Sequence, residues 1–120
     1  MIVRYFYGDR APIRIEEFHP TFGFKLIEEK QCPVVTVCAI FDEETGKLSM
    51  GIARCSEKDR FVKKIGRELA LKAAKENPFM IVSHFSGDFK DFINLVRHTG
   101  HMEERKFYKK YYNNLINGII

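Results

Sequence analysis

The stretch Met50-Gly-Ile-Ala-Arg-Cys-Ser-Glu-Lys-Asp-Arg-Phe-Val-Lys-Lys-Ile-Gly-Arg-Glu-Leu-Ala-Leu-Lys-Ala-Ala74 carries the strongest structural signal in this chain. It predicts the end of a β-strand that leads directly into a long amphipathic helix. Ser56 is suited to cap the helix, and Asp59, three residues later, can complete a capping box. The helix should end near Glu76, because Pro78 disfavours helix at the residue before it. Apolar residues recur at helical spacing, which predicts one buried face: Phe61, Val62, Ile65, Leu69, Ala70 and Ala73.

The opposite side of the predicted helix is basic, since cations recur there at i, i+3, i+4 and i+7: Arg60, Lys63, Lys64 and Arg67. Arginine can hold a phosphate through two hydrogen bonds, and lysine adds a point charge. The amides of a helix N-terminus also attract anions, although the carboxylates of Glu57 and Asp59 would partly neutralise the positive end of the helix dipole. The alternative is an ordinary solvated helix face. Gly66 is unfavourable inside a helix, so we expect another part of the chain to pack close to it.

Length and composition indicate one globular domain spanning residues 1–120. Hydrophobic residues make up 45% and charged residues 30% of the chain, which argues against disorder. The net charge of +4 suits an anionic partner, but it is also common in proteins that bind none. Three cysteines without a Cys-x-x-Cys pair, Cys32, Cys38 and Cys55, predict reduced thiols in a cytoplasm. With no signal-peptide pattern and no apolar run of roughly 18 residues, we expect a soluble intracellular protein without a membrane partner.

The first 55 residues are typical of a small antiparallel β-sheet. Residues 1–7 predict a first strand, and residues 33–41 and 47–55 predict a hairpin whose turn places Gly46 at a positive φ. Residues 8–30 have no assigned role and offer two short extended segments around a loop at residues 19–23. We expect the N-terminal strands to complete a sheet of three to five strands. Two or three helices then follow, giving an α+β fold.

The second half of the chain predicts further elements after Pro78. Residues 79–83 are a last strand or a buried connector, and residues 86–88 precede a helix that Gly100 should terminate. A final helix is expected over residues 102–116. The two helices together carry more aromatic surface than one small sheet can cover, so we predict a homo-oligomer; the alternative is that every aromatic ring folds back onto its own sheet. That surface includes Phe89, Phe92, Tyr108, Tyr111 and Tyr112.

No catalytic or metal-ligating pattern is present in the sequence, so we expect no enzyme, no metal and no cofactor. His98 and His101 are separated by Gly100, and there is no His-Glu-x-x-His motif. Ser83, His84 and Asp88 lie near one another without a Gly-x-Ser-x-Gly elbow. Glycine-rich phosphate loops are also absent from the sequence.

A loop aromatic offers a different kind of site. Phe85 falls outside any apolar stripe and could stack on a purine, and polar groups follow on the next helix: Asp88, Asp91 and Asn94. Such groups can bind ribose hydroxyls. The alternative for Phe85 is a connector residue that fills the core.

The segment from Gly51 to Arg67 is similar to one found in small phage and prophage proteins. There, a strand ending in Gly-x-Ala-x-Cys leads into Ser-x-x-Asp-x-Phe and a Lys-Lys-x-Gly-Arg helix. The chain's size and its hairpin followed by a helix also resemble the Thoeris anti-defence sponges. This resemblance implies a viral protein of the host-cell cytoplasm that binds cyclic ADP-ribose isomers and holds them without cleaving them. It also implies a small antiparallel sheet with helices, assembly into dimers or higher oligomers, and, in some members, a separate site for cyclic oligonucleotides.

The chemistry of such a ligand suggests roles for individual residues. Phe85 would stack on adenine, Asn94 would bind ribose, and Arg60 would bind pyrophosphate, with Asp88, Asp91, Lys63 and Arg67 nearby. A second basic site would fall at Arg105, Lys109 or Lys110. The alternative function is a phage accessory protein that binds DNA or RNA through the basic helix face. A third possibility is an inhibitor that binds a host protein through its aromatic face.

Overall fold

The computed structural model describes residues 1–9, 12–31, 33–56 and 59–119, so Cys32 and Glu57 lie outside the described residues. Within these ranges, the chain has an α+β fold with an antiparallel sheet, a separate two-stranded sheet and two helices. The elements in chain order are β1 (Ile2–Tyr7), β2 (Pro12–His19), β3 (Gly23–Gln31), β4 (Val34–Phe41), β5 (Leu48–Cys55), α1 (Lys63–Glu76), β6 (Met80–Val82) and α2 (Phe89–Ile119).

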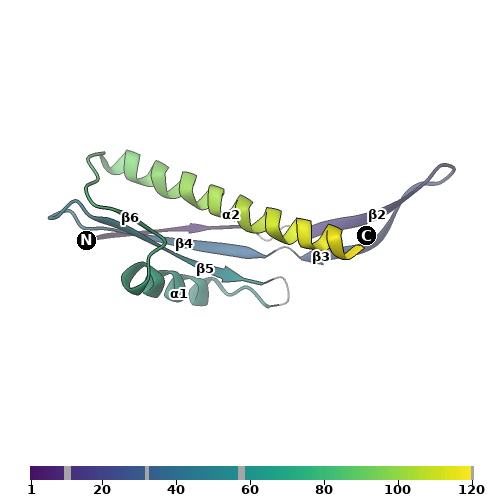
Figure 1. The fold of residues 1–120 in the computed structure, drawn as a ribbon, viewed down its shortest axis with the longest axis horizontal. Helices are drawn as coiled ribbons and strands as arrows, with labels where there is room; N and C mark the ends of the chain where they lie inside the picture. Colours follow the sequence, from purple (N-terminus) through teal and green to yellow (C-terminus); the bar gives the residue numbers. More distant parts are fainter. Residues whose placement is uncertain (10–11, 32, 57–58, 120) are drawn as a thin grey trace.

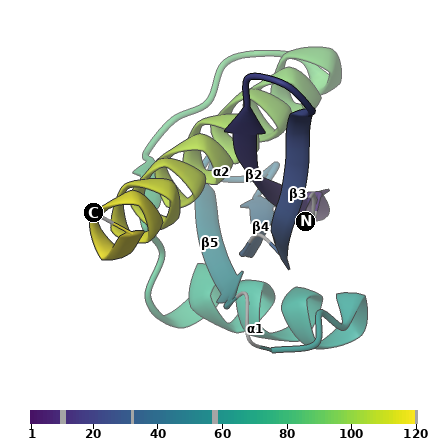
Figure 2. The same ribbon diagram turned by 90° about the vertical axis from the view of Figure 1, so that its right-hand side faces the viewer.

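The main sheet has the strand order β1-β4-β5-β6, and every pair is antiparallel. This confirms the predicted first strand and the predicted hairpin, and it makes the segment after Pro78 an edge strand. The two helices lie on opposite faces of the sheet, α1 on one side and α2 on the other (Figures 1 and 2). The sheet is therefore the middle layer of three.

Strand β4 is buried on both faces, because its side chains alternate between the two helices. Val37 and Ala39 pack in the cluster that contains Phe92 and Val96 of α2. Cys38, between them in sequence, packs against Ala70 and Ala74 of α1. A strand covered on both faces favours apolar side chains at nearly every position, and Thr36 is the only polar residue in β4.

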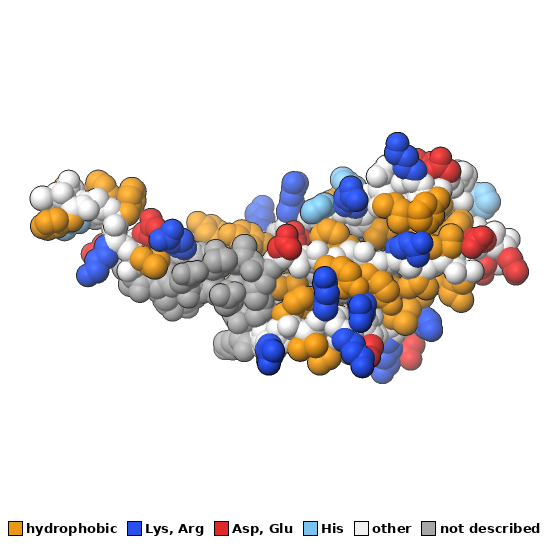
Figure 3. Space-filling model, turned by 180° about the vertical axis from the view of Figure 1, so that it is seen from behind, with side chains coloured by type: hydrophobic (Ala, Val, Ile, Leu, Met, Phe, Trp, Pro, Cys, Tyr) orange, Lys and Arg blue, Asp and Glu red, His pale blue; other side chains and the backbone are white. Residues whose placement is uncertain are grey.

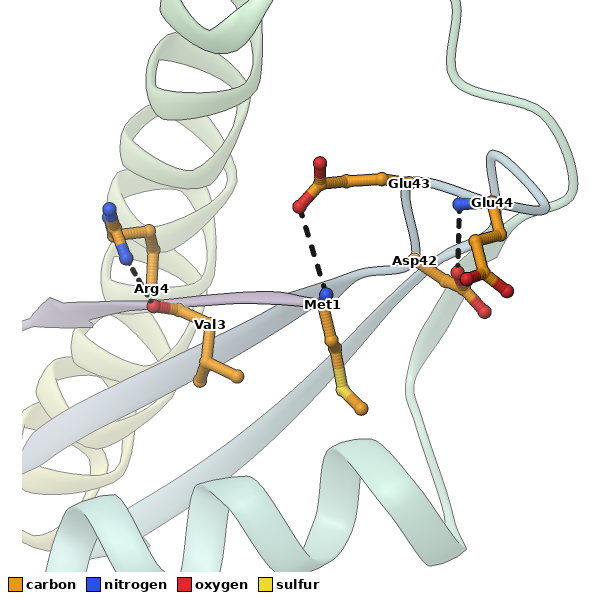
Figure 4. Close-up of polar contacts among 6 residues, drawn as sticks. All are labelled: Met1, Val3, Arg4, Asp42, Glu43 and Glu44. Carbon is orange, nitrogen blue, oxygen red and sulfur yellow. Dashed lines mark hydrogen bonds and ion pairs between the residues drawn. The ribbon is translucent and has the colours of Figure 1, made fainter.

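The turn between β4 and β5 has the predicted chemistry. Gly46 has a φ of 76°, and its amide donates to the Asp42 carbonyl at 2.8 Å. The Asp42 carboxylate accepts a hydrogen bond from the Glu44 amide at 3.0 Å (Figure 4), and such hydrogen bonds lower the pKa of Asp42. The N-terminal amine lies 3.7 Å from Glu43 in the same turn (Figure 4). The first strand is kept close to this turn mainly by its pairing with β4, which begins at Ile2 and Phe41.

Helix α1 begins later than the sequence predicted. Its N-cap is Val62, in an extended conformation and without a side-chain cap. The Ser56 hydroxyl instead hydrogen-bonds to the Asp59 carboxylate at 2.9 Å, which closes a local turn ahead of the helix. The predicted capping box was therefore wrong, and Arg60 precedes the helix rather than lying on its basic ridge.

The buried face of α1 also differs from the predicted stripe. Ile65 and Leu69 are each 53% exposed, whereas Ala70 and Ala74 are buried. A side chain on Gly51 of β5 would collide with the backbone of α1 at Ala70 and Ala74. The helix thus packs on the sheet through small residues, and this close approach turns the larger apolar side chains outward.

Gly66 belongs to the same close contact, as the sequence predicted. A Cβ atom at Gly66 would lie 2.7 Å from the hydroxyl oxygen of Thr36 on β4. The first turns of α1 therefore lie directly above the strand.

Helix α2 is one continuous helix of 31 residues, so the predicted end at Gly100 was wrong. Gly100 is buried against the Phe6 ring, where a side chain would collide with the aromatic carbons. The glycine serves close packing against β1 rather than helix termination. The predicted start was correct, because the Asp88 carboxylate accepts from the Asp91 amide at 2.9 Å and the Asp91 carboxylate accepts from the Asp88 amide at 3.0 Å.

Strands β2 and β3 form a sheet of their own rather than joining the main sheet, which corrects the expected arrangement. They make a long hairpin that projects from the body (Figures 1 and 2). The molecule is accordingly elongated, with extents of 65 × 25 × 22 Å. We call the hairpin from Pro12 to Gln31 the arm.

Within the described ranges, no helix combines the length and the apolar character needed to cross a bilayer. These ranges also contain no group of three or more His, Cys, Asp or Glu side chains placed to hold a metal ion.

The contact at Gly51 predicts a difference between two glycines. Replacing Gly51 with Ala should lower the free energy of unfolding by about 1–3 kcal/mol, because the new methyl group meets the backbone of α1. Gly66→Ala should cost much less, since it meets a side-chain hydroxyl and gains about 1 kcal/mol of helix propensity. Urea denaturation of both variants checks this. Equal losses at the two positions would contradict the packing described.

Stability should also fall at alkaline pH because of Cys38. Burial raises the pKa of this thiol from its ordinary value of 9.0 to about 11. The folded state therefore holds a proton that the unfolded chain releases, so stability is lost as pH rises from about 9 to 11. Cys38→Ala should lessen this decline, although the raised pKa of Tyr5 acts in the same direction. Denaturation between pH 8 and 10.5 measures it, and identical slopes for the two proteins would contradict it.

Candidate ligand-binding site

The start of α1 has the features of an anion-binding helix terminus. It has no side-chain cap and no acidic residue in its first turn. Lys63, Lys64 and Arg67 are exposed around it. The first amides of a helix have no intrahelical acceptor, and the positive end of the helix dipole lies among them. The sequence predicted that Asp59 would offset the positive end of the helix dipole. Because α1 starts after Asp59, this carboxylate lies outside the first turn and does not do so from within the helix.

Two tyrosines of β1 lie beside this terminus. The rings of Tyr5 and Tyr7 are stacked, with centroids 6.1 Å apart and planes inclined by 20°. The Lys63 ammonium lies 4.5 Å from the centre of the Tyr7 ring. We call Tyr5, Tyr7, Lys63 and Arg67 the tyrosine–cation cluster.

The electrostatics of the cluster follow from its surroundings. Burial raises the pKa of Tyr5, and the neighbouring Cys38 thiol adds to that rise. The positive charge of Arg67 acts in the opposite direction. The Tyr5 phenol therefore stays protonated at neutral pH, and its hydroxyl hydrogen-bonds to the Cys38 thiol.

A groove lies on the other side of α1, between the helix and the ends of β4 and β5. Its volume is about 190 Å³, below the roughly 300–1,000 Å³ of typical small-molecule pockets. Thr36, only 1% exposed, lines it. Its walls are mostly apolar, with Arg54, Asp59 and Arg60 as the charged members. We call it the α1 groove; its apolar lining residues include Val34, Ala53, Phe61, Val62, Ile65 and Leu69.

The predicted basic residues are thus divided between two sides of one helix. Lys63 and Arg67 belong to the tyrosine–cation cluster, next to β1, whereas Arg60 lines the α1 groove, next to β5. The helix terminus itself lies between them.

Phe85 fills part of the core. This was the alternative that the sequence left open beside a role in stacking on a purine. Its ring makes edge contacts with Phe41 and Phe92, at centroid distances of 5.6 and 6.3 Å. It packs against the buried cluster beneath α2. Its backbone amide also donates to the Gly46 carbonyl at 2.8 Å, which fixes the connector to the β4–β5 turn.

The polar residues predicted near Phe85 lie on the same side of the sheet. Asp88 and Asp91 bind each other's backbone amides at the start of α2, and Asn94 is exposed on the following turn. This group and the cations of α1 belong to helices on opposite faces of the sheet (Figure 1). The structure therefore does not bring the predicted aromatic, ribose and pyrophosphate residues together.

The residues predicted for a second basic site lie on α2. Arg105 and Lys109 are exposed, but neither lines a cavity of about 430 Å³ beside this helix. That cavity is lined by Arg54, Glu103, Lys106, Phe107 and Lys110. The Arg54 guanidinium lies 5.8 Å from the centre of the Phe107 ring, and Lys106 pairs with Glu103 at 3.3 Å. Of the three residues predicted there, only Lys110 lines it.

Sequence reasoning missed Tyr5 and Tyr7. Their spacing by two places both on one face of β1, and this pattern was visible. The sequence did not show how α1 lies on the sheet, because the apolar stripe of the helix suggested a different helix orientation.

Comparisons of the chain with protein-family models, with curated proteins and with solved structures found no match.

Proposed function

We propose that this protein binds a small nucleotide-derived anion, a cyclic ADP-ribose-type immune signal, and sequesters it without cleavage as a viral anti-defence protein of the host-cell cytoplasm. The observation that carries the proposal is the tyrosine–cation cluster at the uncapped start of α1. The resemblance of the segment from Gly51 to Arg67 to the anti-defence sponges supplies the ligand class.

The cluster offers the contacts that such a ligand needs. Tyrosine rings can stack on a purine, at roughly 1–3 kcal/mol per base. Arg67 and Lys63 can pair with phosphate oxygens, and backbone amides at the start of the helix can donate to the same anion. Lys64 is exposed on the same turn and adds a further positive charge.

The chemistry of the cluster favours holding the ligand over cleaving it. Its members are two phenols, one ammonium and one guanidinium, and the Tyr5 pKa is raised rather than lowered. General-base catalysis needs a group with a pKa close to the working pH. The raised pKa of Tyr5 makes this phenol a poorer base at neutral pH, so we expect the ligand to be released unchanged.

Two further parts of the expected function remain proposals. The cavity next to Arg54, Lys106 and Lys110 would hold a cyclic oligonucleotide, with Arg105 and Lys109 as outer positive charges. Assembly into a dimer or higher oligomer would bury exposed aromatic rings, among them Tyr108 and Tyr112 of α2, which are stacked with centroids 6.2 Å apart.

The alternative function is DNA or RNA binding through α1. The observation that favours it is that Lys72 and Lys75 are also exposed on this helix, so its positive charge continues beyond the cluster. Backbone binding releases counterions and should weaken steeply with salt, whereas binding of one small anion should weaken far less.

The test is native mass spectrometry with a panel of cyclic ADP-ribose isomers and cyclic oligonucleotides, before and after heat denaturation. We expect one isomer to bind and to be released intact. Lys63→Ala and Arg67→Ala should each weaken binding by roughly 10- to 100-fold, because each removes a charge-assisted contact worth about 1.5–3 kcal/mol.

Lys72→Ala is the matched control, since it removes the same charge from the same helix at a distance from the cluster. Equal losses for Lys63→Ala and Lys72→Ala, with a steep salt dependence, would favour the nucleic-acid function instead. A cleaved product would contradict sequestration. Absence of binding across the panel would leave DNA or RNA binding and inhibition of a host protein as the remaining hypotheses.

A further inference from the structure

The α1 groove contains a buried hydroxyl group that has no hydrogen-bond partner. Thr36 is only 1% exposed, and its Oγ1 atom makes no hydrogen bond with the backbone or side chains that the structure describes. Buried hydroxyl groups in proteins are almost always paired, because an unpaired one has given up its hydrogen bonds to water without replacement. A ligand that supplies the missing partner would remove this cost.

Strand alternation places the Thr36 hydroxyl on the floor of the groove. Side chains of a strand alternate between its two faces, and Cys38, two residues further along β4, packs against α1. Thr36 therefore points toward the same helix. Across the hairpin, Ala53 pairs with Thr36 and lines the groove beside it.

The glycine at position 66 leaves the space above this hydroxyl open. A Cβ atom on Gly66 would lie 2.7 Å from Thr36 Oγ1 and 3.5 Å from the Phe61 ring. All three residues line the groove. The hydroxyl group and an aromatic ring thus border the same space, which a side chain at Gly66 would fill.

The outer wall of the groove is apolar and open to solvent. Val62, Ile65 and Leu69 line it and are 40%, 53% and 53% exposed. Figure 3 shows hydrophobic side chains exposed among Lys and Arg side chains over the lower part of the body, where α1 lies. A ligand entering from solvent would bury part of this apolar surface, which favours binding.

The charges around the groove favour a neutral ligand. Asp59 and Arg60 both line it, so their charges balance. Arg54 lines it as well, but its guanidinium lies 5.8 Å from the Phe107 ring of α2, a helix on the other face of the sheet. The groove therefore differs from the tyrosine–cation cluster, where cations at an uncapped helix start favour an anion.

The volume of the groove limits the ligand to about one ring. The groove measures about 190 Å³, and an apolar cavity of roughly 150 Å³ can hold a benzene molecule. We infer that the α1 groove binds a small neutral ligand, one aromatic ring in size, whose single polar group hydrogen-bonds to the Thr36 hydroxyl. Phenols are the simplest members of this class.

This second site goes beyond the proposed function and does not depend on it. The groove lies on the β5 side of α1, whereas the tyrosine–cation cluster lies on the β1 side. A neutral ring and a nucleotide anion would therefore occupy different surfaces.

The test is an NMR titration of the ¹⁵N-labelled full-length protein with phenol and, separately, with toluene, which has nearly the same shape but no hydrogen-bonding group. We expect phenol to bind with a dissociation constant on the order of 1 mM and to shift the amides of residues 53–55 and 65–69 most. Thr36→Val should weaken phenol binding roughly 10-fold and change toluene binding by less than about twofold, because it removes one buried hydrogen bond and keeps the side-chain shape. Urea denaturation checks that this variant keeps its stability.

A second variant tests the space rather than the hydrogen bond. The methyl group of Gly66→Ala would fill the gap between Thr36 and Phe61, so binding of both probes should weaken by roughly 10-fold or more. The matched control is Lys72→Ala, an exposed position of the same helix outside the groove, which should bind both probes like the wild-type protein.

Three results would overturn the inference. The first is the absence of saturable shifts with phenol, or shifts centred outside the groove. The second is an equal change in phenol and toluene binding in Thr36→Val. The third is unchanged binding of both probes in Gly66→Ala.

Discussion

The close contact between Gly51 of β5 and the backbone of α1 controls the arrangement of everything on that side of the sheet. Because no side chain separates strand from helix, α1 sits on the sheet through Gly66, Ala70 and Ala74. That orientation turns Ile65 and Leu69 toward the β5 side and Lys63 and Arg67 toward the tyrosines of β1. A larger residue at Gly51 would lift the helix and disperse both surfaces.

The second constraint is that β4 is covered by a helix on each face. Burial on both sides supplies most of the core, and it also divides the functional surface of the molecule in two. Phe85, Asp88 and Asn94 belong to the α2 side, where the aromatic ring completes the core. The basic terminus of α1 belongs to the other side, where aromatic rings come from β1 instead. A nucleotide site built from both groups would have to span the sheet.

These particulars show what the sequence could and could not predict. Runs rich in apolar and β-branched residues, together with Gly46, correctly located β1, β4 and β5, because strand composition and turn chemistry are local. The predictions for the start of α1, for the end of the helix at Gly100 and for strands β2 and β3 were wrong, because each of these features depends on tertiary contacts. Ser56 could have capped a helix, but its hydroxyl instead donates a hydrogen bond to the Asp59 carboxylate in a turn that precedes α1. The residues predicted from the sequence include Lys63 and Arg67 of the candidate site, whereas Tyr5 and Tyr7 were not predicted, because their place beside these cations depends on helix orientation.

The most direct test of this account is a two-dimensional NMR titration of the ¹⁵N-labelled protein with the ligand from the binding panel, or with ADP-ribose as a surrogate. Binding at the uncapped helix start predicts the largest amide shifts at residues 63–66, with Tyr5 and Tyr7 next, and little change at Phe85 or Asn94. The largest shifts at residues 85–94, with residues 63–66 unaffected, would contradict the account and move the site to the α2 side of the sheet.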